Sequence, residues 1–173
     1  SKVKGPGDLE PALEEAFRHG RKALIEEAID PVREIECALL GNDDPVASVP
    51  GEIFPAGDFY DYQSKYLDQG TRLEVPADLP PAVVEEIQGL AVAAFQAIGC
   101  AGMARVDFFL RTPDGVIVNE INTIPGFTDV SMYPKMWEAS GLPYPQLIDR
   151  LIELALERHT WAATRAGAPE SAS

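Results

Sequence analysis

Four polar side chains in two short apolar segments have the types and spacing that chemistry requires. One segment contains Arg105 and Asp107, and the other ends with Glu120 and Asn122. Side chains alternate between the two faces of a strand, so the polar residues of each segment share a face if both segments are strands. Carboxylate and amide oxygens are hard ligands that suit Mg²⁺, a cation that also holds substrate phosphates. These residues therefore predict a metal site that handles phosphate groups.

The sequence between the two segments predicts how they pair. A Pro-Asp-Gly turn separates them, which is typical of an antiparallel hairpin. A hairpin centred between the proline and aspartate of this turn places Asp107 opposite Glu120. The same register places Arg105 opposite Asn122. Carboxylates that face each other at Cβ separations of ~4.5–5.5 Å repel, so the pair favours a bound cation.

Two alternatives stay open for these residues. A turn centred one residue away would put the two carboxylates on opposite faces of the hairpin. Asp107 could instead form a simple ion pair with Arg105, although Glu120 would then have no role. Residues 123–134 favour the metal site, because loop formers and hydroxyl groups are dense there. A strand that delivers oxygen ligands into such a loop and then into a helix resembles phosphate-handling sites.

The elements that must position these side chains are helices and strands mixed in one unit. Asp8 is expected to cap the first helix and Gly20 to end it. A longer helix begins with proline and stops at Gly99, and its apolar residues form a stripe that faces the core. The stripe consists of Val83, Val84, Ile87, Leu90, Ala91, Ala94, Phe95 and Ile98. We expect helices at 8–19, 81–98, 132–140 and 145–159, and strands at 22–27, 32–40, 46–53 and in the hairpin.

Composition excludes some classes of function. A net charge of −14 argues against nonspecific nucleic-acid binding, which needs a basic face. It does not argue against ATP, because a metal and local positive groups set the field at such a site. No apolar stretch is long enough to span a bilayer and no signal peptide is visible, so we expect a cytoplasmic protein without membrane contact. Cys37 and Cys100 lack metal-ligand spacing and are expected to be free thiols.

Four separated motifs, in the same order, resemble those of the D-alanine–D-alanine ligases, which are ATP-grasp enzymes. The first resembles the family's ribose-contacting strand and the second its mobile loop, and the last resembles its signature. The resemblance covers about residues 1–159. The motifs are REIEC at 33–37, FYDYQSKY at 59–66, RVDFF at 105–109, and NEINTIPGFT at 119–128 with Ser131 and Pro134.

The resemblance implies an α/β (α+β) protein with the ATP-grasp fold: the C-terminal catalytic domain and part of the central ATP-binding subdomain. Residues 1–50 would belong to the central subdomain and residues 51–159 to the catalytic subdomain. The catalytic part includes a loop at 54–79, expected to be mobile without nucleotide, and residues 160–173 would be a flexible tail. The family's phosphate-gripping loop and first D-alanine domain would lie upstream of Ser1. We therefore expect the C-terminal half of a ligase, inactive alone and homodimeric at full length.

The implied activity is ATP-dependent joining of two D-alanines through a D-alanyl phosphate, for peptidoglycan precursors in a bacterial cytoplasm. ATP and D-alanine would be the substrates, with two Mg²⁺ ions, or Mn²⁺, as cofactors. One alternative is a D-alanine–D-lactate or other ATP-grasp carboxylate–amine ligase, but depsipeptide-forming relatives tend to carry His where Tyr66 stands. Another is a nucleotide-binding module that no longer catalyses. Such a module would have lost a metal carboxylate or the arginine, and this chain has both.

By resemblance, Asp107, Glu120 and Asn122 hold the metal ions between the β- and γ-phosphates. Arg105 stabilises the acyl phosphate and the tetrahedral intermediate, a role that suits a guanidinium fork. Charge balance for the carboxylates is the simpler role for Arg105, and both can coexist.

The remaining implied contacts concern the substrates. Gly126, Ser131 and Met132 would receive the second D-alanine, although Ser131 alone could be an ordinary helix N-cap. Lys65 and Tyr66 would close over the site as a lid and exclude water, or they belong to an ordinary surface loop. The nucleotide contacts would be Glu26, Glu27, Ala28 and Ile29 at the adenine, Glu34 at the ribose and Phe59 against the purine. Glu26 and Glu27 could also be a solvated strand end.

Overall fold

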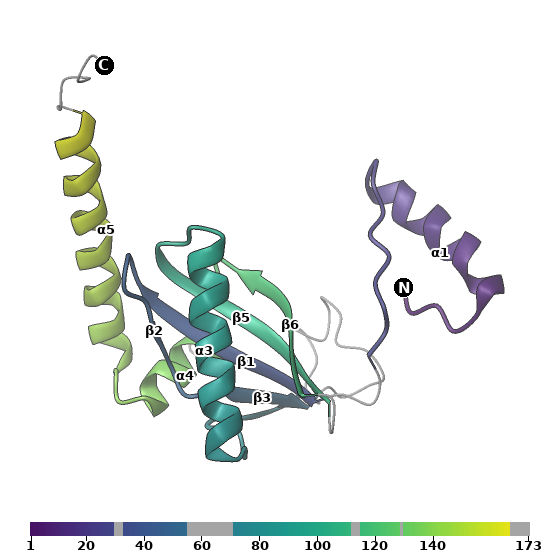
Figure 1. The fold of residues 1–173 in the computed structure, drawn as a ribbon, viewed down its shortest axis with the longest axis horizontal. Helices are drawn as coiled ribbons and strands as arrows, with labels where there is room; N and C mark the ends of the chain where they lie inside the picture. Colours follow the sequence, from purple (N-terminus) through teal and green to yellow (C-terminus); the bar gives the residue numbers. More distant parts are fainter. Residues whose placement is uncertain (30–32, 55–70, 112–114, 129, 167–173) are drawn as a thin grey trace. The chain divides into compact units, whose positions relative to one another are not determined.

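The computed structural model describes residues 1–29, 33–54, 71–111, 115–128 and 130–166 (Figure 1). Phe59, Lys65 and Tyr66, in the expected mobile loop, lie outside the described residues. The chain divides into two compact units, Ser1–Pro31 and Val32–Ser173, and each is described by itself. Among the helices of the described ranges, none combines the length and the apolar character needed to cross a membrane.

The helix of the first unit, α1 (Pro6–His19), begins with proline, whose missing N–H costs no hydrogen bond at that position. Gly5 is the N-cap residue and has no side chain to cap with, so the expected cap at Asp8 is wrong. Asp8 lies in the first turn, where its carboxylate accepts a hydrogen bond from the Lys4 backbone N–H at 3.1 Å. Gly20 ends the helix as expected, with an extended backbone.

The segment after α1 does not form the strand expected at residues 22–27. Residues 22–29 have no regular secondary structure, and no described strand pairs with them. A strand depends on hydrogen bonds to a neighbouring strand, so an apolar pattern without a partner stays irregular. Leu24 is 81 % exposed and Ile25 is 68 % exposed, so these apolar side chains are not buried within their own unit.

An antiparallel sheet is the centre of the second unit (Figure 1). Its strands lie in the order β4-β3-β1-β5-β6, and β2 pairs with the far end of β1. The central strand, β1, pairs with β5 along its whole length. The strands are β1 (Arg33–Gly41), β2 (Val46–Ala47), β3 (Gly51–Phe54), β4 (Arg72–Glu74), β5 (Gly102–Arg111) and β6 (Gly115–Asn122).

Most of the expected strands are confirmed. β1 matches the strand expected at 32–40, and the strand expected at 46–53 is divided at Pro50 into β2 and β3. The expected loop at 54–79 is wrong where β4 forms the edge of the sheet. This strand has three residues, too few for an alternating pattern to show in the sequence. The Arg72 guanidinium lies 3.7 Å from the centre of the Phe54 ring and helps to hold this edge.

The helix α3 (Pro81–Ala97) covers one face of the sheet (Figure 1). Ile87, Ala91 and Phe95 are fully buried, which confirms the centre of the expected stripe. Ile98 is 57 % exposed and its membership of the stripe is wrong, because it caps the helix beyond the last turn that faces the sheet. The strand residues of this core are Ile35, Cys37, Leu39, Ala104, Val106 and Phe108.

The opposite face of the sheet is covered by α4 (Met132–Ala139) and α5 (Tyr144–Ala166). Ala38 and Leu40 of β1 belong to this second core, and they alternate with the β1 residues that face α3. α5 is longer than the helix expected at 145–159, because the first strong helix breaker after it is Gly167. The helix residues of this core are Met132, Tyr133, Met136, Trp137, Leu147 and Leu154.

Candidate active site

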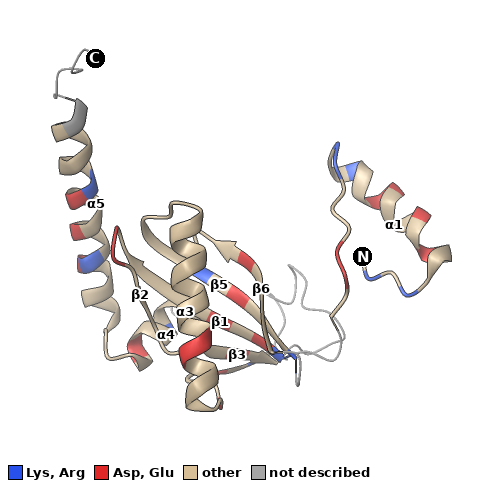
Figure 2. Ribbon diagram, in the orientation of Figure 1, with Lys and Arg blue, Asp and Glu red and all other residues tan. Residues whose placement is uncertain are grey.

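The hairpin of β5 and β6 brings the four polar residues together. Asp107 pairs with Glu120, and Arg105 pairs with Asn122, as the sequence predicts. The Asn122 amide nitrogen donates to Asp107 Oδ2 at 3.1 Å and to Glu120 Oε1 at 3.2 Å, so these three side chains lie on one face. Figure 2 shows the acidic and basic bands that result on β5 and β6.

A β-bulge, and not the turn alone, produces this register. Next to the turn, Arg111 pairs with Gly115, and continuing that register would place Asn119 opposite Asp107. The pairing shifts directly after Asp107, so β6 contains one extra residue and Glu120 takes the facing position. The turn is therefore centred one residue away from the expected centre, which was the alternative left open by the sequence. The bulge compensates for this difference and again places Asp107 opposite Glu120.

Packing on the other face of β6 shows the same change. Val116 and Ile121 both pack against the core beneath α3, although they are five positions apart. In a regular strand an odd spacing puts side chains on opposite faces. The bulge between them therefore exchanges the faces of β6 and turns Glu120 and Asn122 toward the face of α4.

The Arg105 guanidinium is held between two carboxylates. Its Nε donates to Asp107 Oδ1 at 2.6 Å and its Nη2 to Asp107 Oδ2 at 2.7 Å, a bidentate pair. The same Nη2 lies 3.2 Å from Glu36 Oε1 on β1. The ion pair left open as an alternative is thus formed. Glu36 is 3 % exposed and Asp107 8 % exposed, whereas Glu120 is exposed, so the carboxylate pair is buried on one side only.

The donor set fits a divalent cation in its chemistry. Asp107, Glu120 and Asn122 supply hard oxygen atoms from adjacent positions. The site has a net charge of −2, from three carboxylates and one guanidinium, which one divalent ion would balance. The charged residues are Glu36, Asp107, Glu120 and Arg105. Ligation requires Asp107 to free part of the carboxylate that now holds the guanidinium and Asn122 to present its amide oxygen. Within the described ranges, no group of three or more His, Cys, Asp or Glu side chains forms a preassembled metal centre.

β1 places Glu34, the expected ribose contact, on the same face as Glu36 and Asp107. Glu34 lies two residues before Glu36, which pairs directly with Asp107 across the sheet.

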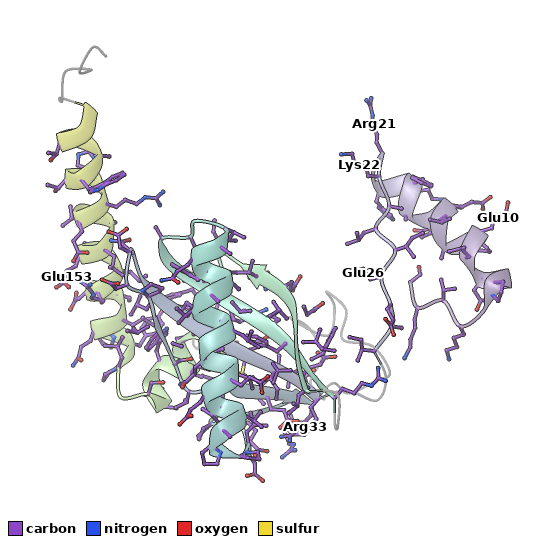
Figure 3. The ribbon with its side chains drawn as sticks, in the orientation of Figure 1. Glu10, Arg21, Lys22, Glu26, Arg33 and Glu153 are labelled. Carbon is purple, nitrogen blue, oxygen red and sulfur yellow. The ribbon has the colours of Figure 1, made fainter. Side chains whose placement is uncertain are left out.

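Arg33, at the start of β1 (Figure 3), pairs with a carboxylate of the neighbouring strand β3 and not with the residues of the site. Its Nε donates to Oε1 of the buried Glu52 at 2.7 Å, and this hydrogen bond is the main cause that raises the pKa of Arg33.

Ser131 stands at the N-cap position of α4 but does not cap the helix. Its side chain makes no capping hydrogen bond, and the Oγ instead accepts from the Thr128 backbone N–H at 3.0 Å. The two hydroxyls, Ser131 Oγ and Thr128 Oγ1, are 2.9 Å apart. The ordinary N-cap alternative is wrong, and the first turn of α4 keeps its backbone N–H groups without a side-chain cap.

Aromatic packing anchors the loop before α4. The Phe127 ring centre lies 5.8 Å from that of Tyr133 and 5.3 Å from that of Tyr144. The Tyr144 hydroxyl also donates to the Phe127 carbonyl at 3.1 Å. Gly126 is half-buried beside this anchor, while the Met132 side chain is 5 % exposed. A substrate contact at Met132 would therefore come from its backbone.

The expected adenine contacts lie in the first unit. Glu26, labelled in Figure 3, is exposed together with Glu27 and Ala28, and Ile29 is half-buried. These four residues follow α1 in the segment without regular structure. Their role at adenine stays a prediction, as do the roles of the residues outside the described ranges.

Sequence reasoning missed two features of the site, Glu36 and the bulge at Asn119. Glu36 alternates with the apolar residues of the strand expected at 32–40 and shares a face with Glu34, so the sequence gives no sign that it is buried. The bulge has no local signal in the sequence either.

The chain matches the protein family described as "D-ala D-ala ligase C-terminus" over residues 1–153. It is 57 % identical over 157 residues to the D-alanine–D-alanine ligase of Halothermothrix orenii, covering 91 % of this chain and 46 % of that protein. It is 54 % identical over 160 residues to D-alanine–D-alanine ligase A of Escherichia coli, covering 92 % of this chain and 44 % of that protein. The chain thus spans less than half the length of these relatives.

Solved structures are similar over nearly the whole chain. The D-alanine–D-alanine ligase of Coxiella burnetii has a TM-score of 0.85 and 46 % identity, and the match covers 96 % of this chain and 43 % of that one. The VanG D-Ala:D-Ser ligase of Enterococcus faecalis has a TM-score of 0.77 and 37 % identity, with 87 % and 43 % covered. The Bacillus anthracis ligase complexed with ATP has a TM-score of 0.77 and 31 % identity, with 92 % and 51 % covered.

Proposed function

Because this chain belongs to the D-Ala–D-Ala ligase C-terminal family and has the ATP-grasp fold, we propose that it supplies the catalytic half of an ATP-dependent ligase. The proposed reaction joins two D-alanines through a D-alanyl phosphate, for peptidoglycan precursors in the cytoplasm. The observation that carries the proposal is the set of Arg105, Asp107, Glu120 and Asn122, which share one face of the hairpin.

The proposed chemistry has two steps. A carboxylate oxygen of the first D-alanine attacks the γ-phosphorus of ATP, and ADP leaves as the acyl phosphate forms. The amine of the second D-alanine then attacks the carbonyl carbon, loses a proton, and expels phosphate from the tetrahedral intermediate. Negative charge develops on the transferred phosphoryl group and then on an oxyanion, so fixed cations and donors do most of the work.

The chain's own residues have distinct parts in this reaction. Asp107, Glu120 and Asn122 would hold Mg²⁺, which neutralises the phosphate charge when it is bound. Arg105 would direct its guanidinium fork at the phosphoryl oxygens and then at the oxyanion. Ser131, at the start of α4, would bind the carboxylate of the second D-alanine together with backbone N–H groups of the first helical turn.

The other expected roles remain part of this proposal. Gly126 and Met132 would complete the acceptor site, and Lys65 and Tyr66 would close over it. The adenosine would contact the segment 26–29, Glu34 and Phe59. We also propose a homodimer at full length, two Mg²⁺ ions, and residues 1–50 and 51–159 as parts of the central and catalytic subdomains.

A depsipeptide or D-alanyl-D-serine product is the second candidate. The similarity to a D-Ala:D-Ser ligase supports considering it, since that protein has the same fold around a different acceptor. Tyr66 favours the dipeptide, because depsipeptide-forming relatives tend to carry His at this position. The non-catalytic module is disfavoured by the complete set of Arg105 and the three oxygen ligands.

The test is ADP release by the protein in its full natural length, with ATP and Mg²⁺. D-alanine alone is compared with D-alanine plus D-lactate and with D-alanine plus D-serine, and the products are identified by mass spectrometry. We expect D-alanyl-D-alanine from D-alanine alone and its loss in Glu120→Gln. A product formed only with D-lactate or D-serine would move the assignment to that ligase, and ATP binding without any product would support the non-catalytic module. Turnover by residues 1–173 alone would contradict the expected dependence on a further half.

A further inference from the structure

A buried carboxylate that the proposed roles leave unused lies next to the site. Glu36 occupies the middle of β1, directly opposite Asp107 in the pairing of β1 with β5. It is 3 % exposed, and the next residues on its face, Ala38 and Leu40, belong to the apolar core under α4 and α5. Burial of a carboxylate is unfavourable unless a positive partner compensates for it. At this position the partner is Arg105, whose Nη2 lies 3.2 Å from Glu36 Oε1.

Arg105 cannot keep all of its present contacts when the site is loaded. Both oxygens of Asp107 accept hydrogen bonds from the guanidinium, at 2.6 Å and 2.7 Å. A cation bound at Asp107 is attracted by the carboxylate. The same cation is repelled by a guanidinium that holds the same two oxygens. Arg105 must therefore release at least part of Asp107, and its contact with Glu36 does not compete with the cation.

We propose that Glu36 is a positioning residue that holds the Arg105 guanidinium when Asp107 turns to the metal–nucleotide. Glu36 would act as the fixed anchor, and the freed edge of the guanidinium would point at the transferred phosphoryl group. The inference rests on the proposed function and deepens it, because it gives a reason for a charged residue that is buried beside the apolar core under α4 and α5. It differs from a purely structural role, which would require a buried Glu36–Arg105 pair but no effect on the chemical step.

A second buried pair in the same sheet provides the matched control. Glu52 of β3 is 2 % exposed and pairs with Arg33, as Glu36 pairs with Arg105. Glu52 lies opposite Ile35, whose side chain faces the α3 core, so it is on the face away from Asp107. Glu52→Gln therefore weakens the ion pair of an equally buried glutamate without touching the proposed site, although the Arg33 side chain is 41 % exposed and that of Arg105 only 12 %.

The experiment compares Glu36→Gln, Glu36→Asp and Glu52→Gln in the protein at its full natural length. The readouts are kcat and KM for ATP and D-alanine, the Tm, and the Kd of a non-hydrolysable ATP analogue with Mg²⁺ by calorimetry. We expect Glu36→Gln to lower kcat by about 100-fold, the scale of a misplaced catalytic group, with the analogue's Kd changed by less than about threefold. Glu36→Asp keeps the charge and should recover part of kcat, while Glu52→Gln should lower the Tm similarly and leave kcat near the parent value.

A double variant tests whether Glu36 acts through Arg105. Arg105→Lys keeps a positive charge but loses the guanidinium fork. If Glu36 only positions that fork, adding Glu36→Gln to Arg105→Lys should lower kcat no further. An additional loss in the double variant would overturn the inference, as would an unchanged kcat in Glu36→Gln or equal losses in kcat and analogue binding. If Glu36→Gln does not fold, a Glu36→Asp variant with parental kcat and a lowered Tm would overturn it instead.

Failure of the two claims can be told apart. An active parent with an unaffected Glu36→Gln variant would overturn this inference alone. A folded parent that makes no product with any acceptor would overturn the proposed function, and the inference with it.

Discussion

Gly51 is the point at which the sheet constrains the start of α4. A Cβ added at Gly51 would overlap the Cε of Met132 and lie 3.0 Å from Val75 Cγ2. Met132 is buried and immediately follows Ser131, the proposed acceptor contact. The overlapping atom is the far end of a flexible side chain, but the Met132 side chain is buried. We therefore expect Gly51→Ala to force Met132 into another rotamer and thereby to disturb the first turn of α4 beside Ser131.

The size of the effect follows from the packing. Adding a methyl group to a filled core costs roughly 1–3 kcal/mol, because neighbours must leave their preferred rotamers. In a protein of this size each kcal/mol corresponds to a change in Tm of about 2–4 °C. Gly51→Ala should thus lower the Tm by roughly 2–12 °C in differential scanning calorimetry. In the ligase assay, KM for the acceptor D-alanine should rise more than KM for ATP.

Gly89 in α3 provides the matched control. A Cβ at Gly89 would meet nothing within 4 Å, and alanine is the better helix former. Gly89→Ala should therefore raise the stability by about 0.5–1 kcal/mol. Met132→Leu removes the overlapping Cε, so the double variant Gly51→Ala/Met132→Leu should regain most of the lost stability. A Gly51→Ala protein as stable as Gly89→Ala, or no recovery in the double variant, would refute the reasoning.

Two further predictions concern buried groups of the sheet. Tyr133 donates its hydroxyl proton to the Leu39 carbonyl at 2.8 Å in the core, so Tyr133→Phe should lower the unfolding free energy by about 1–2 kcal/mol in urea titrations. The control Tyr144→Phe removes a more exposed hydrogen bond and should cost less; equal losses would contradict the role of burial. Burial raises the pKa of the Cys37 thiol from its ordinary value of 9.0 to about 12. Between pH 9 and about pH 12 the folded protein therefore keeps a proton that the unfolded chain loses. The free energy of unfolding should fall across this range by at most about 1.4 kcal/mol per pH unit, whereas below pH 9 this contribution to stability is fully present. Cys37→Ala should remove this part of the alkaline slope, and an unchanged slope would contradict it.

Local sequence patterns predicted a large part of the fold. The helix at 81–98 and the central strand at 32–40 were confirmed within one residue at each end, because their apolar periods are long enough to be distinctive. The strand expected at 22–27 was wrong, since a short apolar pattern does not specify a pairing partner. The edge strand β4 was missed for the related reason that its three residues carry almost no pattern.

In the candidate site too, the sequence predicted some features and the tertiary structure decided others. The residue types alone determined the chemistry on offer: a guanidinium, carboxylates and an amide, two residues apart in each of two strands. The facing of Asp107 and Glu120 was confirmed, but the turn by itself would have placed Asn119 there. Only the bulge, which lets both ends of β6 pack against the same core, brings Glu120 into register.

The contact between Glu36 and Arg105 was decided entirely by tertiary structure. These residues are far apart in the sequence, and they meet because β1 lies between β3 and β5 in the sheet. The order of strands is selected by the burial of whole faces against α3 on one side and α4 and α5 on the other. A local pattern determines which residues can share a face, whereas the choice of neighbouring strand depends on the packing energy of the complete fold.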